Sequence, residues 1–344
     1  MKALVFTKPQ VLELRDAPAP VPAHGEALLK VLACAICGSD VHGWLGTNGR
    51  RTAPVVMGHE LTAKVEALGD GCTGNLKVGD VVAIQPLIPC FDCAYCKKGM
   101  TNICPNRKVL GVLDTGGAMQ DYITMPEKHC FVLPAGMSYK TGALAEPFAV
   151  SYCAVKKAGD LRGKNVLIVG GGVIGLLALM AAKLQNPKKI ALSDMSEPRL
   201  EIAKKLGAQA TINPGTGDFD EQITEVFGGE MADVTIEAVG IATTVNQALR
   251  ATAPGGTSVW IGNNIKTIDV NMQDIVTREI TVKGTYMFAH EAFGEVIEQF
   301  ARLDVSALID SEVPLENAPE MFKALFENPD KYLKCIINFA AGEE

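Results

Sequence analysis

Four cysteines close together in the chain form its strongest chemical signal: Cys90, Cys93, Cys96 and Cys104. Thiolates spaced in this way can surround one tetrahedral metal ion without other ligands, and a closed shell of four sulfurs is typical of structural zinc. Iron–sulfur clusters use similar spacing, and disulfides are a third alternative. The charged pair Lys97–Lys98 places the segment on an exposed loop, and nothing else in the sequence indicates electron transfer. We therefore predict a structural zinc that holds a loop.

A second set of candidate ligands comes from two separate segments, Cys37–His42 and Gly58–Glu60. They offer one thiol, imidazoles and carboxylates. Ligands of mixed type from different loops suit a catalytic zinc, which keeps one coordination position open. A lone histidine is more often a surface or core residue, and we expect this of His24, His129 and His290.

A glycine motif follows an apolar segment that is predicted to be a strand. Gly170, Gly172 and Gly175 form a G-x-G-x-x-G pattern around Val173 and Ile174, and a helix is predicted to follow. In this context the first glycine makes a tight turn, the second lets the backbone approach a pyrophosphate, and the third allows close helix–strand packing. The helix N-terminus offers free N–H groups to the phosphates. The motif predicts a dinucleotide site, although flavin and S-adenosylmethionine domains carry similar patterns.

Two charged residues bear on which dinucleotide binds. Asp194 lies at the end of the next predicted strand, where an acid accepts hydrogen bonds from the adenosine ribose. A carboxylate there repels a 2′-phosphate, so the sequence favours NAD over NADP. Arg199, five residues later, works against this preference because a guanidinium attracts phosphate.

The elements that must position these residues change character near residue 160. Residues 1–150 contain short apolar runs punctuated by proline and glycine, which predicts a strand-rich, partly barrel-like unit. Alternating strands and helices then predict a parallel, doubly wound sheet. The predicted strands are Lys164–Val169, Lys189–Ser193, Ala210–Ile212, Asp233–Glu237, Thr257–Ile261 and Glu279–Gly284, and the predicted helices are 173–185, 197–206, 219–227 and 243–251.

The last part of the chain has no predicted sheet of its own. Helices near 291–303 and 316–327 precede a closing strand, Leu333–Phe339, so we expect this part to return to the first unit. The predicted domains are residues 1–150 with a cysteine lobe at about 86–106, then 151–286, and finally 287–344.

The composition narrows the class of protein. The 344 residues are 48% hydrophobic and 21% charged, which is typical of a soluble globular protein. The net charge of −7 argues against nucleic-acid and acidic-membrane partners. The N-terminus lacks the long apolar run of a signal peptide, so we expect a cytoplasmic protein, in which clustered thiols are metal ligands more often than disulfides.

On these motifs the sequence resembles the zinc-containing medium-chain dehydrogenases, and among them the sorbitol dehydrogenase-like polyol group. The resemblance covers essentially the whole chain and implies a Rossmann sheet inserted in a GroES-like catalytic domain. It also implies two zinc ions, NAD, and a homo-oligomer such as a dimer or tetramer. The matching segments are Cys37-Gly38-Ser39-Asp40-x-His42, Gly58-His59-Glu60, Gly79-Asp80-x-Val82, the four cysteines, Glu146-Pro147, the glycine motif and Asp194.

The resemblance also implies roles for particular residues. Cys37 and His59 would bind the catalytic zinc, while Glu60 and Glu146 would supply carboxylates, one directly and the other through the metal's water. The zinc would polarise a secondary alcohol that gives its hydride to NAD.

Other residues of the same region have expected roles. Ser39 would accept the substrate's proton and His42 would pass it to solvent. The alternative interpretations are a helix cap for Ser39 and an exposed turn residue for His42. Trp44, Met287 and Phe288 are candidates for the pocket wall, although such residues usually lie in the core.

The expected substrate is a polyol or sugar alcohol. Alternatives with the same machinery are a polyol phosphate, threonine or a short diol. The run Pro86–Phe91 resembles phosphopolyol dehydrogenases such as galactitol-1-phosphate 5-dehydrogenase, and Arg50 and Arg51 could serve a phosphate or form a solvated pair. A zinc-free reductase or a non-catalytic relative is disfavoured because the four candidate ligands of the catalytic zinc are intact.

Overall fold

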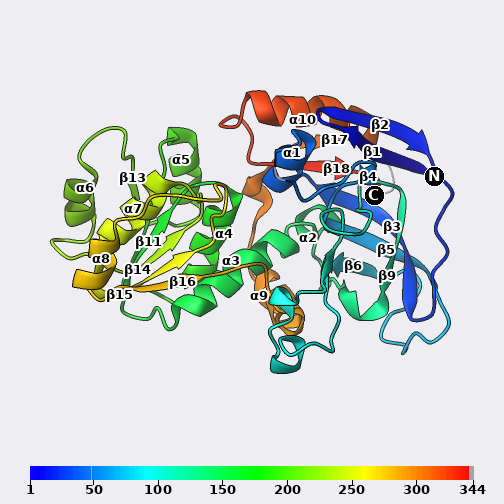
Figure 1. Cartoon of the computed structure of the whole chain (residues 1–344), viewed down its shortest axis with the longest axis horizontal. Helices are drawn as coiled ribbons and strands as arrows, with labels where there is room; N and C mark the ends of the chain where they lie inside the picture. The colour runs from blue at the N-terminus through cyan, green and yellow to red at the C-terminus, as the bar shows by residue number, and fades with distance from the viewer. Residues whose placement is uncertain (48, 341–344) are drawn as a thin grey trace. The chain divides into compact units, whose positions relative to one another are not determined.

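The computed structural model describes residues 1–47 and 49–340, and the chain forms two compact units. Unit 1 combines Met1–Glu146 with the segment that starts at Phe288, and unit 2 is Pro147–Met287 (Figure 1). The sequence prediction put these two boundaries after residues 150 and 286. The chain thus leaves unit 1, builds unit 2 and returns.

Unit 2 contains a six-stranded parallel sheet with the strand order β13-β12-β11-β14-β15-β16. The order reverses between β11 and β14, which confirms the predicted doubly wound fold. The elements of this part of the chain are α3 (Ala145–Ala158), β11 (Asn165–Val169), α4 (Val173–Lys183), β12 (Lys189–Ser193), α5 (Glu197–Lys205), β13 (Ala210–Ile212), α6 (Phe219–Val226), β14 (Ala232–Glu237), α7 (Ala242–Ala251), β15 (Thr252–Trp260), α8 (Met272–Thr277) and β16 (Thr281–Gly284).

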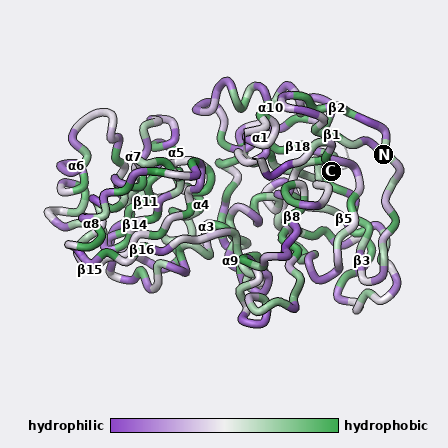
Figure 2. The backbone as a smooth tube through the Cα atoms, in the orientation of Figure 1, coloured by the Kyte–Doolittle hydropathy of each residue, from purple (hydrophilic) through white to green (hydrophobic). Residues whose placement is uncertain are grey.

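Hydrophobic sequence explains why β11 lies at the centre of this sheet. All five of its residues are buried, as expected for a strand covered on both faces. Helix α4 is buried from Gly175 to Ala182, and both segments are coloured hydrophobic in Figure 2. The central strand therefore delivers the glycine turn to the carboxyl edge of the sheet, where ligands bind in such folds.

Unit 1 is built mainly of strands. Its largest sheet has the order β10-β6-β5-β3-β18-β17, and β9 also pairs with β3. Smaller sheets have the orders β2-β1-β4 and β7-β8. The helices and strands are β1 (Lys2–Lys8), β2 (Val11–Asp16), β3 (Glu26–Ala35), α1 (Gly38–Trp44), β4 (Val55–Val56), β5 (Glu60–Leu68), β6 (Val81–Ile84), β7 (Leu87–Ile88), β8 (Lys108–Val109), β9 (Tyr122–Pro126), β10 (Cys130–Val132), α2 (Tyr139–Gly142), α9 (Phe293–Phe300), β17 (Ile309–Val313), α10 (Ala318–Glu327) and β18 (Lys334–Asn338).

The return of the chain to unit 1 completes the large sheet. Strand β18 pairs antiparallel with β3 and parallel with β17, and all five of its residues are buried. Strand β17 was not predicted, because its sequence IDSEV is half-exposed and carries two acids. Within the described residues, no helix combines the length and apolar character that a bilayer-spanning segment needs.

Candidate active site

Strand β3 ends just before the first candidate ligand, and the start of α1 fixes that ligand in place. Cys37 is the N-cap of α1: its Sγ accepts a hydrogen bond from the Ser39 N–H at 3.4 Å. The Cys37 N–H in turn donates to the Asp40 carboxylate at 3.0 Å. This reciprocal capping orients both the thiol and Asp40.

The second segment turns sharply before it enters β5. Gly58 has φ +98°, and a Cβ at this position would meet Cys34 Sγ at 2.7 Å, so only glycine fits. The turn brings His59 and Glu60, both buried, beside Cys37. The ligand atoms of these three residues lie within 4.8 Å of one another. One sulfur, one nitrogen and one oxygen form a donor set that fits zinc with an open coordination position.

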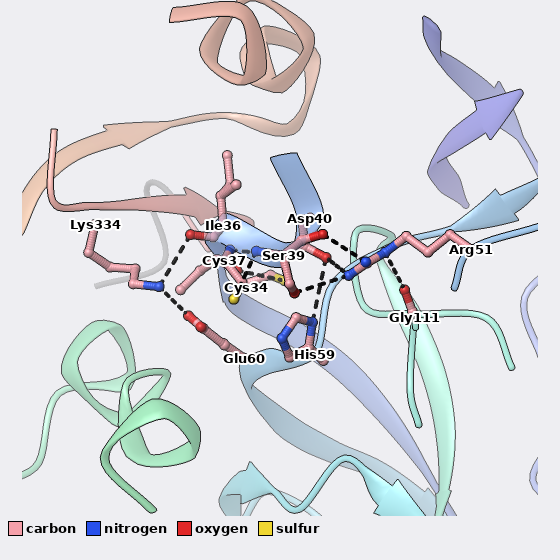
Figure 3. Close-up of polar contacts among 11 residues, drawn as sticks. Cys34, Ile36, Cys37, Ser39, Asp40, Arg51, His59, Glu60, Gly111 and Lys334 are labelled. Atoms are coloured by element: carbon pink, nitrogen blue, oxygen red, sulfur yellow. Dashed lines mark hydrogen bonds and ion pairs between the residues drawn. The ribbon is translucent and has the colours of Figure 1, made fainter. Parts of the chain in front are cut away.

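A buried carboxylate orients the imidazole. Asp40 Oδ1 lies 3.5 Å from His59 Nδ1 and accepts a hydrogen bond from the Arg51 guanidinium at 2.5 Å (Figure 3). Burial alone would raise the pKa of Asp40, but the charges of His59 and Arg51 hold that pKa well below its usual range. Burial likewise opposes a charged His59, yet Asp40 raises the pKa of the imidazole. An ionised carboxylate on Nδ1 leaves Nε2 as the ligand atom, the usual arrangement around metal-bound histidine.

Two further buried groups surround Glu60. The Lys334 ammonium donates to Glu60 Oε2 at 2.7 Å and to the Ile36 carbonyl at 3.2 Å. Glu146 is buried in the first turn of α3, outside the three-residue donor set. Burial raises the pKa of Glu146 to about 7, with the Glu60 charge adding to the effect and His59 opposing it. Sequence reasoning missed Lys334, because no local motif connects it to a residue 274 positions earlier.

The proposed proton carriers share one helix. Ser39 is half-buried and His42 is exposed, one turn later on α1. Residues three apart on a helix are neighbours on its surface. Ser39 Oγ lies 3.4 Å from an Arg51 amino group.

Several side chains expected near the substrate lie elsewhere. The side chain of Arg51 is 1% exposed and bonded to Asp40, so the hypothesis that it serves a phosphate is wrong. Trp44 packs against the Phe322 ring with centroids 6.1 Å apart, and Phe288 stacks on Phe293 at 5.1 Å. Both rings are buried core residues, and the exposed edge of Trp44 lines a surface pocket with Gln10, Leu12 and Lys323, which includes none of the candidate zinc ligands. Met287 is half-buried and has φ +46°.

The four lobe cysteines come together as expected. The Sγ atoms of Cys93 and Cys96 lie 3.5 Å apart, as do those of Cys104 and Cys90. All four ligand atoms lie within 4.8 Å of one another, and the described residues contain no disulfide. Backbone N–H groups of Asp92 and Cys93 lower the pKa of the Cys90 thiol to about 6, which favours the thiolate that binds metal. This closed four-sulfur set fits structural zinc.

Within unit 1, the cysteine lobe contacts the segment of the chain that returns after unit 2. Thr101 Oγ1 accepts a hydrogen bond from the His290 N–H at 2.7 Å and donates to Glu291 at 3.2 Å. The ring of Phe91 meets that of His290 edge-on at 5.3 Å. His129 is fully buried and its Nδ1 lies 2.6 Å from Gln85 Oε1, in agreement with its expected place in the core.

The three glycines of the predicted dinucleotide motif form a tight turn between β11 and α4. Gly170 has φ +105°, and a Cβ on Gly175 would lie 1.8 Å from the Gly170 carbonyl oxygen. Gly172 is the N-cap of α4, and a Cβ there would meet no atom within 4 Å. The first N–H groups of a helix, here starting at Val173 and Ile174, have no partner within it. The turn therefore leaves an open backbone cradle in front of a positive helix end.

Asp194 borders this cradle. Its carboxylate accepts hydrogen bonds from the N–H of Gly171 at 2.6 Å and of Ser196 at 2.8 Å. Arg199 lies 4.0 Å from the same carboxylate. A carboxylate has about four acceptor sites, so both ribose hydroxyls can still bind to it.

Comparison with known proteins gives a family match for a large part of each unit of the chain. Residues 23–135 match the alcohol dehydrogenase GroES-like domain, and residues 173–302 match the zinc-binding dehydrogenase family. The sorbitol dehydrogenase of Bacillus subtilis is 32% identical over 345 aligned residues, which cover 98% of this chain and 97% of that protein. A zinc-binding dehydrogenase from Sinorhizobium meliloti, solved with NADP bound, superimposes with a TM-score of 0.90 at 30% identity over 98% of both chains. Galactitol-1-phosphate dehydrogenase from Escherichia coli gives a TM-score of 0.92 at 26% identity, covering 98% of this chain and 100% of that one.

Proposed function

The chain belongs to the zinc-binding alcohol dehydrogenases, and from this premise we propose that it interconverts a secondary hydroxyl group of a polyol and the corresponding ketone, with NAD as the hydride carrier. The observation that carries the proposal is the mixed donor set of Cys37, His59 and Glu60, within 4.8 Å of one another. Such a set suits a metal that must also contact substrate. The closed set of four lobe thiols suits a second, structural ion.

The donor set and the residues around it have different proposed roles. Cys37, His59 and Glu60 would hold the catalytic zinc, which when bound stabilises negative charge on the substrate oxygen. Glu146 is the nearby carboxyl whose pKa is raised to about 7, so it can hold or release a proton near neutral pH. Lys334 provides the buried Glu60 carboxylate with a partner of opposite charge, which it needs in the low-dielectric interior.

Proton transfer is assigned to α1. The Ser39 hydroxyl would accept the substrate's proton, and the exposed His42 would pass it to solvent. The support is their spacing of one helical turn and the change from half-buried to exposed along that turn.

The cofactor assignment depends on unit 2. The turn of Gly170, Gly172 and Gly175 would hold the pyrophosphate of NAD, whose nicotinamide supplies the hydride acceptor. Asp194 would bind the adenosine ribose and repel a 2′-phosphate. The S. meliloti relative was solved with NADP, so membership of the family does not decide between NAD and NADP. We base the proposed preference for NAD in this chain on Asp194. Arg199, at 4.0 Å from that carboxylate, would weaken the preference.

The substrate is proposed to be an unphosphorylated polyol. The similarity to B. subtilis sorbitol dehydrogenase over almost the whole chain supports this class. A polyol phosphate is the second candidate, because a galactitol-1-phosphate dehydrogenase has the same fold. The Arg51 guanidinium is hydrogen-bonded to Asp40. One of the two arginines that could have bound the phosphate is therefore not available for it.

A substrate panel tests this proposal. NAD reduction would be measured with sorbitol, xylitol, galactitol, galactitol 1-phosphate, threonine and 2,3-butanediol, together with the zinc content per chain. We expect the highest kcat/KM for an unphosphorylated polyol and two zinc ions per chain. A higher value for galactitol 1-phosphate, threonine or the diol would replace the polyol, and no turnover with any alcohol would overturn the dehydrogenase assignment.

We also propose that the enzyme is a homo-oligomer. Met272 and Val276 on α8 are 70% and 64% exposed, and Ile265, in the segment between β15 and α8, is 51% exposed. Burial of such apolar surface against a second copy is favourable. Sedimentation of the purified protein tests this, and a monomer at micromolar concentration would contradict it.

A cytoplasmic location is proposed from the cysteines. All ten are free thiols; four of them form one metal-ligand set, and Cys37 belongs to the other. A reducing compartment preserves such thiols. Fractionation of cells, followed by detection of the protein with an antibody, tests the location.

A further inference from the structure

The Arg51 guanidinium forms an unusually complete set of contacts behind the candidate zinc site. Its Nη2 donates to Asp40 Oδ1 at 2.5 Å, and its Nη1 donates to the Ser39 carbonyl at 2.7 Å. Its Nε donates to the Gly111 carbonyl at 3.1 Å. These bonds connect α1, whose N-cap is Cys37, to the loop that carries Gly111 (Figure 3).

The space for this side chain exists only because residue 43 is glycine. A Cβ at Gly43 would lie 2.5 Å from Arg51 Cδ and 2.8 Å from its Nη1. Gly43 has no positive φ, so its backbone conformation does not require glycine. The arginine passes across α1 at this point, and its hydrogen bonds leave it little room to yield.

We propose that Arg51 is a positioning residue of the catalytic zinc site: its guanidinium fixes Asp40, and through Asp40 the His59 imidazole, in the orientation that binds the metal. This inference rests on the proposed function, because it takes Cys37 and His59 as the ligands. Without Arg51, the Asp40 carboxylate would keep the Cys37 N–H and His59 as partners among the described residues. The carboxylate can then rotate, and the imidazole loses its fixed direction.

The geometry requires arginine and not only a positive charge. Three nitrogens of one planar group reach three acceptors on two segments. A lysine ammonium is a point charge and cannot span them. Loss of partners beyond the ligands lowers metal affinity by about 10- to 100-fold in known sites.

Zinc release provides the test without a measurement of turnover. The full-length enzyme loaded with two zinc ions would be mixed with excess of a colorimetric chelator, and the release of each ion followed. We expect Arg51→Gln to release one ion about tenfold faster than wild type and the other at the wild-type rate. Arg51→Lys should give an intermediate rate. Gly43→Ala, which displaces the guanidinium without removing its charge, should change the rate in the same direction.

One further variant makes the outcome specific. Glu127→Gln removes a buried carboxylate that accepts hydrogen bonds from Thr73, Asn75 and Leu76 far from α1. It should lower the Tm and leave both release rates and the d–d spectrum of the cobalt-substituted enzyme unchanged, whereas Arg51→Gln should shift that spectrum.

The variants also separate this inference from the ligand assignment. If Cys37→Ser keeps two tightly bound zinc ions, the proposed catalytic site itself is wrong. If Cys37→Ser loses one ion but Arg51→Gln and Gly43→Ala release zinc at wild-type rates, only the role of Arg51 is wrong. An Arg51→Gln variant that does not fold would leave Arg51→Lys and Gly43→Ala to decide.

Discussion

Single side chains of the proposed zinc site should control turnover and leave dinucleotide binding intact. Replacing His59 with alanine removes one of three donors, and a bound metal supplies several kcal/mol of charge stabilisation in such reactions. We expect His59→Ala to lower kcat/KM by roughly a thousandfold or more. A fluorescence titration with NADH should give a Kd close to that of wild type, because the glycine turn belongs to unit 2. Turnover near the wild-type rate would remove His59 from the catalytic site.

A buried histidine outside the site should make stability depend on pH. Burial lowers the pKa of His129 to about 3, and the charges of His290 and Lys128 add to the effect. Between pH 6.5 and 3 the unfolded chain binds a proton here that the folded chain does not. Above pH 6.5, His129 is neutral in both states and costs the folded protein no stability. As the pH falls below 6.5, protonation of the unfolded chain lowers the free energy of unfolding by about 1.4 kcal/mol per pH unit.

The measurement is urea unfolding of wild type and His129→Asn between pH 5 and 6.5. Asparagine can still donate to Gln85, and contributions shared by the two proteins cancel in the comparison. The slope of the unfolding free energy against pH should be smaller for the variant than for wild type. The two slopes should differ by up to about 1.4 kcal/mol per pH unit, which corresponds to one proton. Equal slopes would show that His129 is not buried in its neutral form.

The residues of the site differ in how well the sequence reveals them. Cys37, His59 and Glu60 stand in short motifs, and the structure groups them. Arg51 and Lys334 have no such signal, since their partners are set by packing between distant segments. The Arg51 contacts also depend on the absence of a side chain at residue 43, which a motif search does not detect.

At the scale of elements, the cysteine lobe should stabilise the protein without contacting substrate. Removal of one of its four thiols opens a closed metal shell and weakens the attachment of Thr101 to the returning chain. We expect Cys93→Ser to lower the Tm by at least roughly 5 °C, and the ratio of kcat/KM between two polyols to stay constant. Cys72→Ser is the matched control, because Cys72 lies outside the lobe and serine can keep its bond to the Glu26 carbonyl. A stable Cys93→Ser enzyme with a changed substrate preference would contradict the structural role.

Elements with a strong period were easier to predict than short or half-exposed ones. β12 and β13 have the predicted bounds, and β11 begins one residue later than predicted. β15 begins at Thr252 and not at Thr257, because Pro254, Gly255 and Gly256 hide its first half from a pattern search. Helix α1 has only two turns and is set by capping, a local effect that hydrophobic periodicity does not show.

At the scale of the whole molecule, metal and dinucleotide functions are assigned to different units, so they should respond to different mutations. Asp194 belongs to unit 2, where its carboxylate accepts hydrogen bonds from the N–H groups of Gly171 and Ser196. Two like charges about 4 Å apart near a protein surface repel by about 4 kcal/mol. Solvent and Arg199 reduce this value, so we expect wild type to prefer NAD over NADP by roughly 10²- to 10³-fold.

Asp194→Ser should weaken NAD, improve NADP and leave two zinc ions per chain. The measurement is kcat/KM for both cofactors together with the zinc content. Asp160→Ser, which changes an exposed carboxylate of the same unit, is the control. A wild-type preference for NADP, or an unchanged cofactor ratio in Asp194→Ser, would show that another residue selects the cofactor.

The position of β18 has a consequence for biosynthesis. This strand lies between β3 and β17 in the large sheet, and its first residue holds Glu60 from 274 positions later in the chain. A nascent chain on the ribosome therefore carries both zinc-ligand segments long before it carries Lys334. Contacts so distant in sequence form slowly, since loop closure must precede them. A polypeptide released before residue 334 has an incomplete sheet and an unneutralised Glu60, so interrupted translation cannot yield a finished copy of this active site.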